Sequence, residues 1–339
     1  MRASLLERVA CPKCRGPLSA ERLRRSGSQI IKGALACESC KQAYPIVAGI
    51  PSFFLRPHPY PVLFLPPETL VPDMGRLYYS RKRSPIPFVR AIQLHGVEKF
   101  MDAVRRGAPL PSKMGAVPWN PSVDPISPIS RREARRFSTK AFFKHTVNTL
   151  MKKRWWKDKG CLAFADAIKE LTPRRLLDFA TGPGAVVCKA LLELKKMQAI
   201  ALEIFFEKCR LVTSEARYLG IRRRLEVVHG DARVMPFPDR SFDCVSGAEA
   251  LYHVAHYEVA LHEVARVLRP GGHLVANVHA KYPSHSGGLL TRREEVEFIR
   301  FAHLPLSVKQ VRRNMEKAGL RVIRDHEIGN TRLLVARKM

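Results

Sequence analysis

The chain has 339 residues, enough for two or three domains with a sizeable core. It carries 59 lysines and arginines against 30 acidic residues, a net charge of +29, and is otherwise composed like a globular protein. No apolar run is long enough for a signal peptide or a membrane span, so we expect a globular, cytoplasmic protein without a disulfide framework among its eight cysteines.

The excess of positive charge is greatest in the middle of the chain. Residues 56–160 hold 21 basic and 7 acidic side chains. Such a balance favours partners with phosphate groups, either nucleic acid or an anionic membrane surface. Arginines that merely decorate a solvated surface are the alternative explanation, and the composition leaves both open.

Four cysteines near the N-terminus form two C-x-x-C pairs that are 22 residues apart. Each pair presents two thiolates to one tetrahedral ion, and four thiolates close the coordination shell, as in structural zinc sites. Residues 17–36 between the pairs are predicted to form a hairpin. Redox-active pairs or unrelated buried thiols are the alternatives, although a redox pair needs no second copy at this spacing. The predicted zinc ligands are Cys11, Cys14, Cys37 and Cys40.

The residues around these cysteines resemble the zinc-ribbon family that includes the activating subunit of eukaryotic tRNA and translation-factor methyltransferases. Besides the cysteines, the likeness rests on Tyr44-Pro-Ile and Gly49-Ile-Pro51. In that family the ribbon binds a methyltransferase and covers its apolar surface. The resemblance therefore implies a zinc-ribbon domain over residues 1–55 whose methyltransferase partner belongs to the same chain.

Residues 56–138 are predicted to be a proline-rich, basic linker with one helix over residues 88–106. Three basic segments lie within it or just beyond, at residues 81–83, 131–136 and 152–157. The last one interleaves Trp155 and Trp156 with cations, as in a surface that stacks RNA bases and neutralises phosphates. Those tryptophans are equally well explained as core anchors of the helical lead-in to the next domain.

A second domain is predicted over residues 139–339, with a helical lead-in over residues 139–172. Its first motif is a buried strand at residues 176–179, a turn at Gly182 and Gly184, and a helix over residues 185–197. Glycines there let a ligand approach the backbone and the N-terminus of the helix. Glu203 ends the next apolar run, where a carboxylate usually binds ribose hydroxyls. A dinucleotide is disfavoured because its G-x-G-x-x-G/A fingerprint needs a small residue where this chain has Val187, and because the acid Asp178 precedes the glycines here.

The elements that follow alternate between strands and helices, which predicts a parallel sheet covered on both faces. Apolar helical stripes end at Gly220, at residues 270–272 and at Gly319, and the last helix begins with a capping box of Ser307 and Gln310. Two final strands, at residues 321–328 and 332–336, are predicted to form an antiparallel hairpin around Gly329-Asn330.

Four motifs in this order resemble the class I S-adenosylmethionine-dependent methyltransferases, in the subgroup of the ubiquinone/menaquinone C-methyltransferases. The motifs are LLDFATGPG, ALE ending at Glu203, and residues 227–245 and 261–278. The resemblance covers residues 171–339 and implies an α/β fold, a doubly wound, mostly parallel, seven-stranded Rossmann-like sheet, here with a small N-terminal zinc ribbon. Ala180 stands where the family has its first glycine, a common variant.

The resemblance also implies positions for the cofactor. Asp178, Ala180, Gly182 and Gly184 are expected at the methionine end, Glu203 at the ribose, and Asp231 with Ala232 at the adenine. Residues 247–253 lack the Asn/Asp-Pro-Pro-Tyr/Phe motif of base-amine methyltransferases. The candidates for a base or a substrate contact are then Glu249, Tyr252, His253 and His256, with a structural or cofactor-shielding histidine as the alternative. Core positions are predicted for Cys161, Cys188, Cys209 and Cys244.

Three functions are compatible with this sequence. The zinc ribbon and the basic middle region favour a methyltransferase that acts on RNA or a translation component. The motif resemblance favours one that acts on a small molecule or lipid. A non-catalytic binding module is the third, against which the intact Asp178, Glu203 and Asp231 argue.

Overall fold

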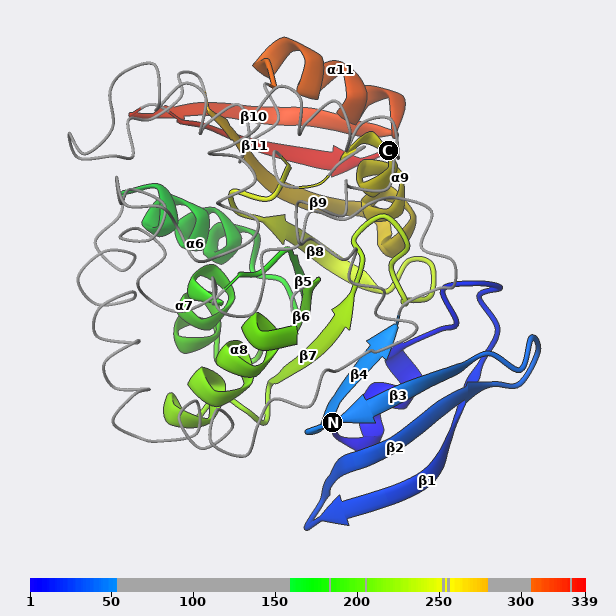
Figure 1. Cartoon of the computed structure of the whole chain (residues 1–339). Coiled ribbons are helices and arrows are strands. Elements are labelled where there is room, and N and C mark those ends of the chain that lie inside the picture. The colour runs from blue at the N-terminus through cyan, green and yellow to red at the C-terminus, as the bar shows by residue number, and fades with distance from the viewer. Residues whose placement is uncertain are drawn as a thin grey trace, which may run out of the picture. The chain divides into compact units, whose positions relative to one another are not determined.

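The computed structural model describes residues 1–53, 159–182, 184–204, 206–251, 254, 257–279, 306–329 and 331–339, which all belong to one compact unit (Figure 1). The linker predicted over residues 56–138, its helix and the three basic segments lie outside the described residues, together with Trp155 and Trp156. None of the described helices is both long and apolar enough to cross a membrane.

The N-terminal ribbon is a four-stranded antiparallel meander preceded by one short helix. The hairpin predicted over residues 17–36 is present, with its turn between the first two strands. Its small core is closed by side chains such as Leu5, Leu35 and Ile46, and the Tyr44 ring lies 5.1 Å from that of Phe53. The elements are η1 (Ala3–Arg8), β1 (Leu18–Ser26), β2 (Gln29–Cys37), β3 (Ala43–Val47) and β4 (Ile50–Phe53).

The second part of the unit confirms the predicted doubly wound sheet. Its seven strands follow the order β7-β6-β5-β8-β9-β11-β10, and the first five are parallel. The strands are β5 (Arg175–Phe179), β6 (Gln198–Glu203), β7 (Leu225–Gly230), β8 (Phe242–Gly247), β9 (Leu268–His279), β10 (Leu320–Ile328) and β11 (Thr331–Lys338). Strand β11 runs antiparallel to both neighbours, which confirms the predicted closing hairpin.

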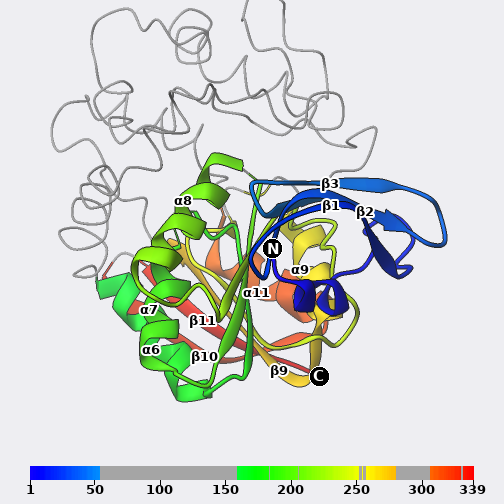
Figure 2. The ribbon, with the colours of Figure 1, turned by 90° about the horizontal axis from the view of Figure 1, so that it is seen from below.

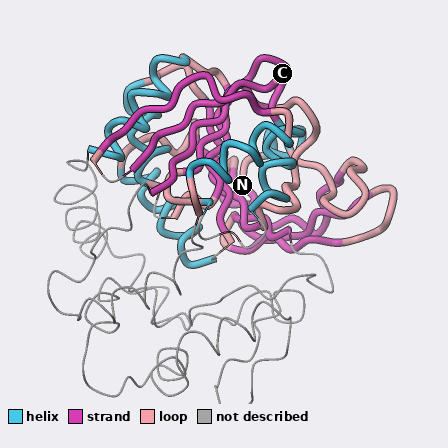
Figure 3. The backbone as a smooth tube through the Cα atoms, turned by 90° about the horizontal axis from the view of Figure 1, so that it is seen from above, coloured by secondary structure: helices cyan, strands magenta, loops and turns pink. Residues whose placement is uncertain are grey.

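Helices cover both faces of this sheet, so its central strands are buried on both sides. Figure 2 shows α6, α7 and α8 on one face and α9 and α11 on the other, and Figure 3 shows the strands as the layer between them. The apolar runs of β5 and β6 are fully buried as a result. The helices are α6 (Lys159–Leu171), α7 (Ala185–Glu193), α8 (Phe206–Tyr218), α9 (Tyr257–Val267) and α11 (Val308–Lys317).

The ribbon and the parallel sheet are continuous, which the sequence did not predict. Strand β4 pairs in parallel with β7, with Ser52 opposite His229 and Phe53 opposite Gly230. The combined sheet has eleven strands, in the order β1-β2-β3-β4 and then β7 onwards. An edge strand leaves backbone donors and acceptors unpaired, and β4 satisfies them along the end of β7.

Two local predictions differ from the structure. Helix α7 ends at Glu193 instead of residue 197, because Leu194 leaves the helical conformation while its N–H bonds to the carbonyl of Ala190. Residues 270–272, predicted as a turn that ends a helix, lie within β9. They form a bulge there, since the register passes from Phe242 opposite Leu268 to Cys244 opposite His273. The Ser307 cap is as predicted, its side chain accepting from the N–H of Gln310.

Candidate cofactor site and metal centre

The four predicted zinc ligands meet at one point of the ribbon. Their sulfur atoms all lie within 4.8 Å of one another, with 3.6 Å between Cys11 and Cys40 and 3.4 Å between Cys14 and Cys37. A tetrahedral ion with Zn–S bonds of about 2.3 Å needs sulfur atoms about 3.8 Å apart. The thiols therefore fit a structural zinc ion.

The two knuckles have the same backbone geometry. Arg15 and Lys41 each follow a second cysteine, have φ values of 64° and 59°, and donate their N–H to the carbonyls of Cys11 and Cys37. These turns bring both thiols of a pair to one side. The Tyr44 hydroxyl lies 3.1 Å from the sulfur of Cys11, and burial together with this contact raises the pKa of Tyr44, so the hydroxyl keeps its proton and can donate it to a zinc-bound thiolate.

The glycine turn after β5 is open to a ligand. Gly182 has a φ of 56°, and among the described residues a Cβ built on it meets no atom within 4 Å. Gly184, with a φ of 86°, caps α7, and its Cβ would lie 3.1 Å from Val212 of α8. Gly184 thus favours close packing of α7 against α8, whereas Gly182 borders space that no described residue fills. Ala180 has a φ of 49°, the left-handed region that costs a non-glycine residue roughly 1–2 kcal/mol.

Asp178 fixes the start of this turn. The side chain is 2% exposed, and its two oxygens accept from the hydroxyls of Thr181 and Ser246, both at 2.5 Å. Burial raises the pKa of Asp178 to about 6, opposed by these hydrogen bonds and reinforced by the charge of Glu203. The carboxylate therefore ties Thr181, in the loop between β5 and α7, to Ser246 of β8.

Glu203, at the end of β6, closes the same turn from the neighbouring strand. Its carboxylate accepts from the N–H of Gly182 at 2.7 Å and from the N–H of Ile204 at 2.9 Å. Each carboxylate oxygen can accept more than one hydrogen bond, which suits the two hydroxyls of a ribose. The parallel pairing of β5 with β6 brings these residues to one edge of the sheet.

Asp231 follows β7 at the same edge and is buried with Ala232. It accepts from the backbone N–H of Arg233 at 2.9 Å and from the Arg233 guanidinium at 2.6 Å. Arg233 was not predicted as a site residue, although its position two residues after the acid is a signal that the sequence contains. This buried pair holds the loop that is expected to receive the adenine.

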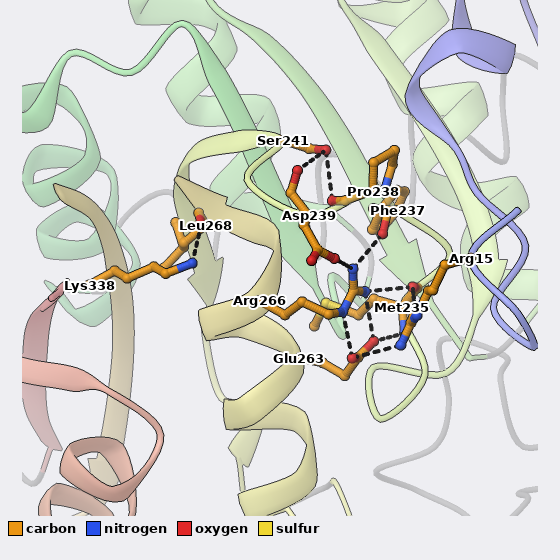
Figure 4. Close-up of polar contacts among 10 residues, drawn as sticks. All are labelled: Arg15, Met235, Phe237, Pro238, Asp239, Ser241, Glu263, Arg266, Leu268 and Lys338. Atoms are coloured by element: carbon orange, nitrogen blue, oxygen red, sulfur yellow. Dashed lines mark hydrogen bonds and ion pairs between the residues drawn. The ribbon is translucent and has the colours of Figure 1, made fainter. Parts of the chain in front are cut away.

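The zinc ribbon also holds this loop. Arg15, next to Cys14, donates to the carbonyl of Met235 at 2.8 Å and to Glu263 of α9 at 2.9 Å (Figure 4). Glu263 in turn accepts the N–H of Met235 at 2.7 Å and is paired with Arg266 at 2.7 Å. The ribbon, the loop and α9 thus share one network of ion pairs and hydrogen bonds, which the sequence did not predict.

Of the candidates for a base or substrate contact, only Glu249 lies among the described residues. It has a φ of 54°, donates its N–H to Asn277 at 2.7 Å, and accepts from the Asn277 amide. The other three, Tyr252, His253 and His256, lie outside the described residues. Cys188, Cys209 and Cys244 are fully buried, as predicted for core residues, and the side chain of Cys161 lies outside the described part of the chain.

Two families match different parts of the chain. Residues 177–276 match the family described as methyltransferase domain, and residues 2–49 match the family described as Trm112p-like protein. The first match, together with the doubly wound sheet, places residues 177–276 in the class of methyltransferase domains. In this chain such a domain follows an N-terminal region similar to Trm112p-like proteins, whose four cysteines fit a zinc ion.

Similar proteins include the ubiquinone/menaquinone biosynthesis C-methyltransferase UbiE of Pseudomonas savastanoi pv. phaseolicola, 32% identical over 43% of this chain and 55% of the relative. The demethylmenaquinone methyltransferase of Thermus thermophilus is 37% identical over 38% of this chain and 57% of that protein. The chain spans about half the length of the curated relatives it matches. Among solved structures, a complex of the Haloferax volcanii Trm112 methyltransferase activator with a methyltransferase has a TM-score of 0.45 at 22% identity, covering 60% of this chain and 97% of that chain.

Proposed function

We propose that this protein transfers a methyl group from S-adenosylmethionine to an acceptor. The observation that carries the proposal is the turn at Gly182, which has open space beside it among the described residues. Glu203 accepts the N–H of Gly182, and Asp178 holds Thr181 of the same turn. In this arrangement Glu203 binds the ribose and Asp231 with Ala232 holds the adenine. The methionine part lies along the turn formed by Asp178, Ala180, Gly182 and Gly184.

The bound cofactor supplies an electrophilic methyl group on a sulfonium ion. The protein then has to hold the nucleophile of the acceptor in line with the bond that breaks and to keep water out. A general base is needed only if the acceptor atom carries a proton. Glu249, Tyr252, His253 and His256 remain the candidates for that role or for a substrate contact.

Binding of S-adenosylhomocysteine, measured by titration calorimetry, tests the cofactor site. Gly182→Ala places a methyl group in the space proposed for the cofactor, and we expect at least about tenfold weaker binding, or about 1.4 kcal/mol. Gly220→Ala is the matched control, because Gly220 has a similar φ of 70° and equally open surroundings, after α8. Equal affinities of the two variants would place the cofactor elsewhere.

Two acceptor classes are supported by different observations. The net charge of +29 and the Trm112p-like ribbon support RNA or a translation component. The names of the relatives support a quinone-like small molecule or lipid. For RNA, the basic segments at residues 81–83, 131–136 and 152–157 are the proposed contacts.

Methyl transfer from labelled S-adenosylmethionine distinguishes the two classes. RNA and lipid extracts from a deletion strain are compared with those from the parent strain, whose methylation sites are already filled. Label in the deletion-strain RNA, with RNA affinity that falls steeply with salt, supports the first class. Label in the lipid extract supports the second, and cofactor binding without any transfer supports the non-catalytic module.

The domain boundaries and the location in the cell are part of the same proposal. We propose that residues 1–55, 56–138 and 139–339 are the ribbon, the linker and the methyltransferase domain. A cytoplasmic location is proposed because the four zinc-binding thiols have to stay reduced.

A further inference from the structure

A buried hydrogen-bonded pair joins the ribbon to the methyltransferase sheet where β4 meets β7. The Ser52 hydroxyl lies 2.8 Å from Nδ1 of His229, and Nε2 of the same ring lies 2.9 Å from the carbonyl oxygen of Ile204. Ser52 is 2% exposed and His229 is 0% exposed. The ring therefore bridges the ribbon and the segment that follows β6.

The partners of His229 determine its tautomer. A carbonyl oxygen can only accept, so Nε2 carries the hydrogen and donates it to Ile204. Nδ1 is then the acceptor, and the Ser52 hydroxyl is its donor. Burial lowers the pKa of His229 to about 3, so the ring stays neutral and this direction of donation persists at neutral pH.

The residue that His229 holds is the neighbour of the proposed ribose carboxylate. Ile204 accepts from His229 through its carbonyl and donates its own N–H to Glu203 at 2.9 Å. The same carboxylate accepts the N–H of Gly182 at 2.7 Å. One series of hydrogen bonds thus runs from Ser52 in the ribbon through His229 and Ile204 to Glu203 and the glycine turn.

Strand pairing alone does not require these side chains. The backbones of β4 and β7 pair whatever side chains they carry, and an apolar pair would fill the same buried space, although the Ile204 carbonyl would then lose its His229 donor. Polar side chains here do something that apolar ones cannot, which is to hold the Ile204 carbonyl in place and so restrain the residue whose N–H Glu203 accepts.

We propose that Ser52 is a positioning residue of the cofactor site, through which ribbon strand β4 sets the orientation of Glu203 by way of His229. The inference rests on the proposed function, because it takes Glu203 as the residue that binds the cofactor ribose. The ribbon is then a structural part of the cofactor site, in addition to covering the edge of the sheet.

Titration of the full-length, zinc-loaded protein with S-adenosylhomocysteine tests this. Ser52→Ala removes the hydroxyl with the least change of volume, and we expect roughly five- to tenfold weaker binding, as for the loss of one hydrogen bond. Ser52→Thr keeps the hydroxyl, and Ser52→Val has the shape of the threonine variant without the hydroxyl. We expect binding within about twofold of the parent for the threonine variant and weakening like that of alanine for the valine variant.

Nitrogen NMR of the His229 ring supplies a readout that general destabilisation does not move. The Nδ1 resonance is expected to shift towards that of an imidazole nitrogen without a donor in the alanine and valine variants, and to stay in place in the threonine variant. If the parent binds and Ser52→Ala binds equally well, the inference is wrong while the proposed function stands. A parent protein that does not bind S-adenosylhomocysteine refutes the proposed function instead.

Discussion

Glu215 of α8 is a buried carboxyl group whose ionisation should weaken the fold. The side chain is 3% exposed, and among the described residues its Oε1 has no hydrogen-bond partner. Burial raises the pKa of Glu215 from 4.5 to about 8. The group lies near α7, since burial and then the Glu215 charge raise the pKa of the Cys188 thiol.

The sign of the effect follows from proton binding. Between the two pKa values the folded state holds a proton that the unfolded state has lost, so stability falls as the pH rises. Each pH unit in this window lowers the free energy of unfolding by about 1.4 kcal/mol. From about pH 6 to about pH 9 the free energy of unfolding of the parent falls by about 2–3 kcal/mol through this group, and that of Glu215→Gln should not show this fall.

Urea unfolding of zinc-loaded protein at several pH values measures this difference. The raised pKa of Asp178 affects parent and variant alike and cancels in the comparison. Glu316→Gln on the exposed side of α11 is the control, and its curve should run parallel to that of the parent. If the Glu215→Gln curve also runs parallel to the parent curve, Glu215 does not carry a strongly raised pKa.

Two further predictions concern the ribbon. Elemental analysis should find one zinc ion per chain. The ion should be lost in Cys11→Ser and in Cys40→Ser, and the ribbon should unfold with it, because a small domain of this kind depends on its metal. Metal-free parent protein with an intact ribbon would contradict this. Arg15→Met should speed amide hydrogen exchange of Met235 and Phe237 by roughly fivefold, because the loop loses about 1 kcal/mol of hydrogen bonding. Lys13→Met is the control, since Lys13 is exposed and has no described ion pair, and it should leave the exchange rates unchanged.

The sequence alone determined those features that depend on residues close together along the chain. The spacing within each C-x-x-C pair predicted the two knuckles, and the strand–glycine–helix pattern around Gly182 predicted the turn before α7. The order of strands and helices predicted the doubly wound sheet, since each parallel crossover buries an apolar face that the residue pattern displays. Even so, the end of α7 was misplaced, because the residues after Glu193 retain an apolar pattern.

Only the tertiary structure decided how the ribbon meets the cofactor site. Ser52 and His229 are far apart in the sequence, as are Arg15 and Glu263, and periodicity within an element does not specify which sheet edges will pair. The sequence predicted a ribbon and a sheet, whereas the pairing of β4 with β7 made them one sheet of eleven strands. The physical reason is that the edge of β7 satisfies its backbone groups with a distant segment, and only the folded chain reveals which one.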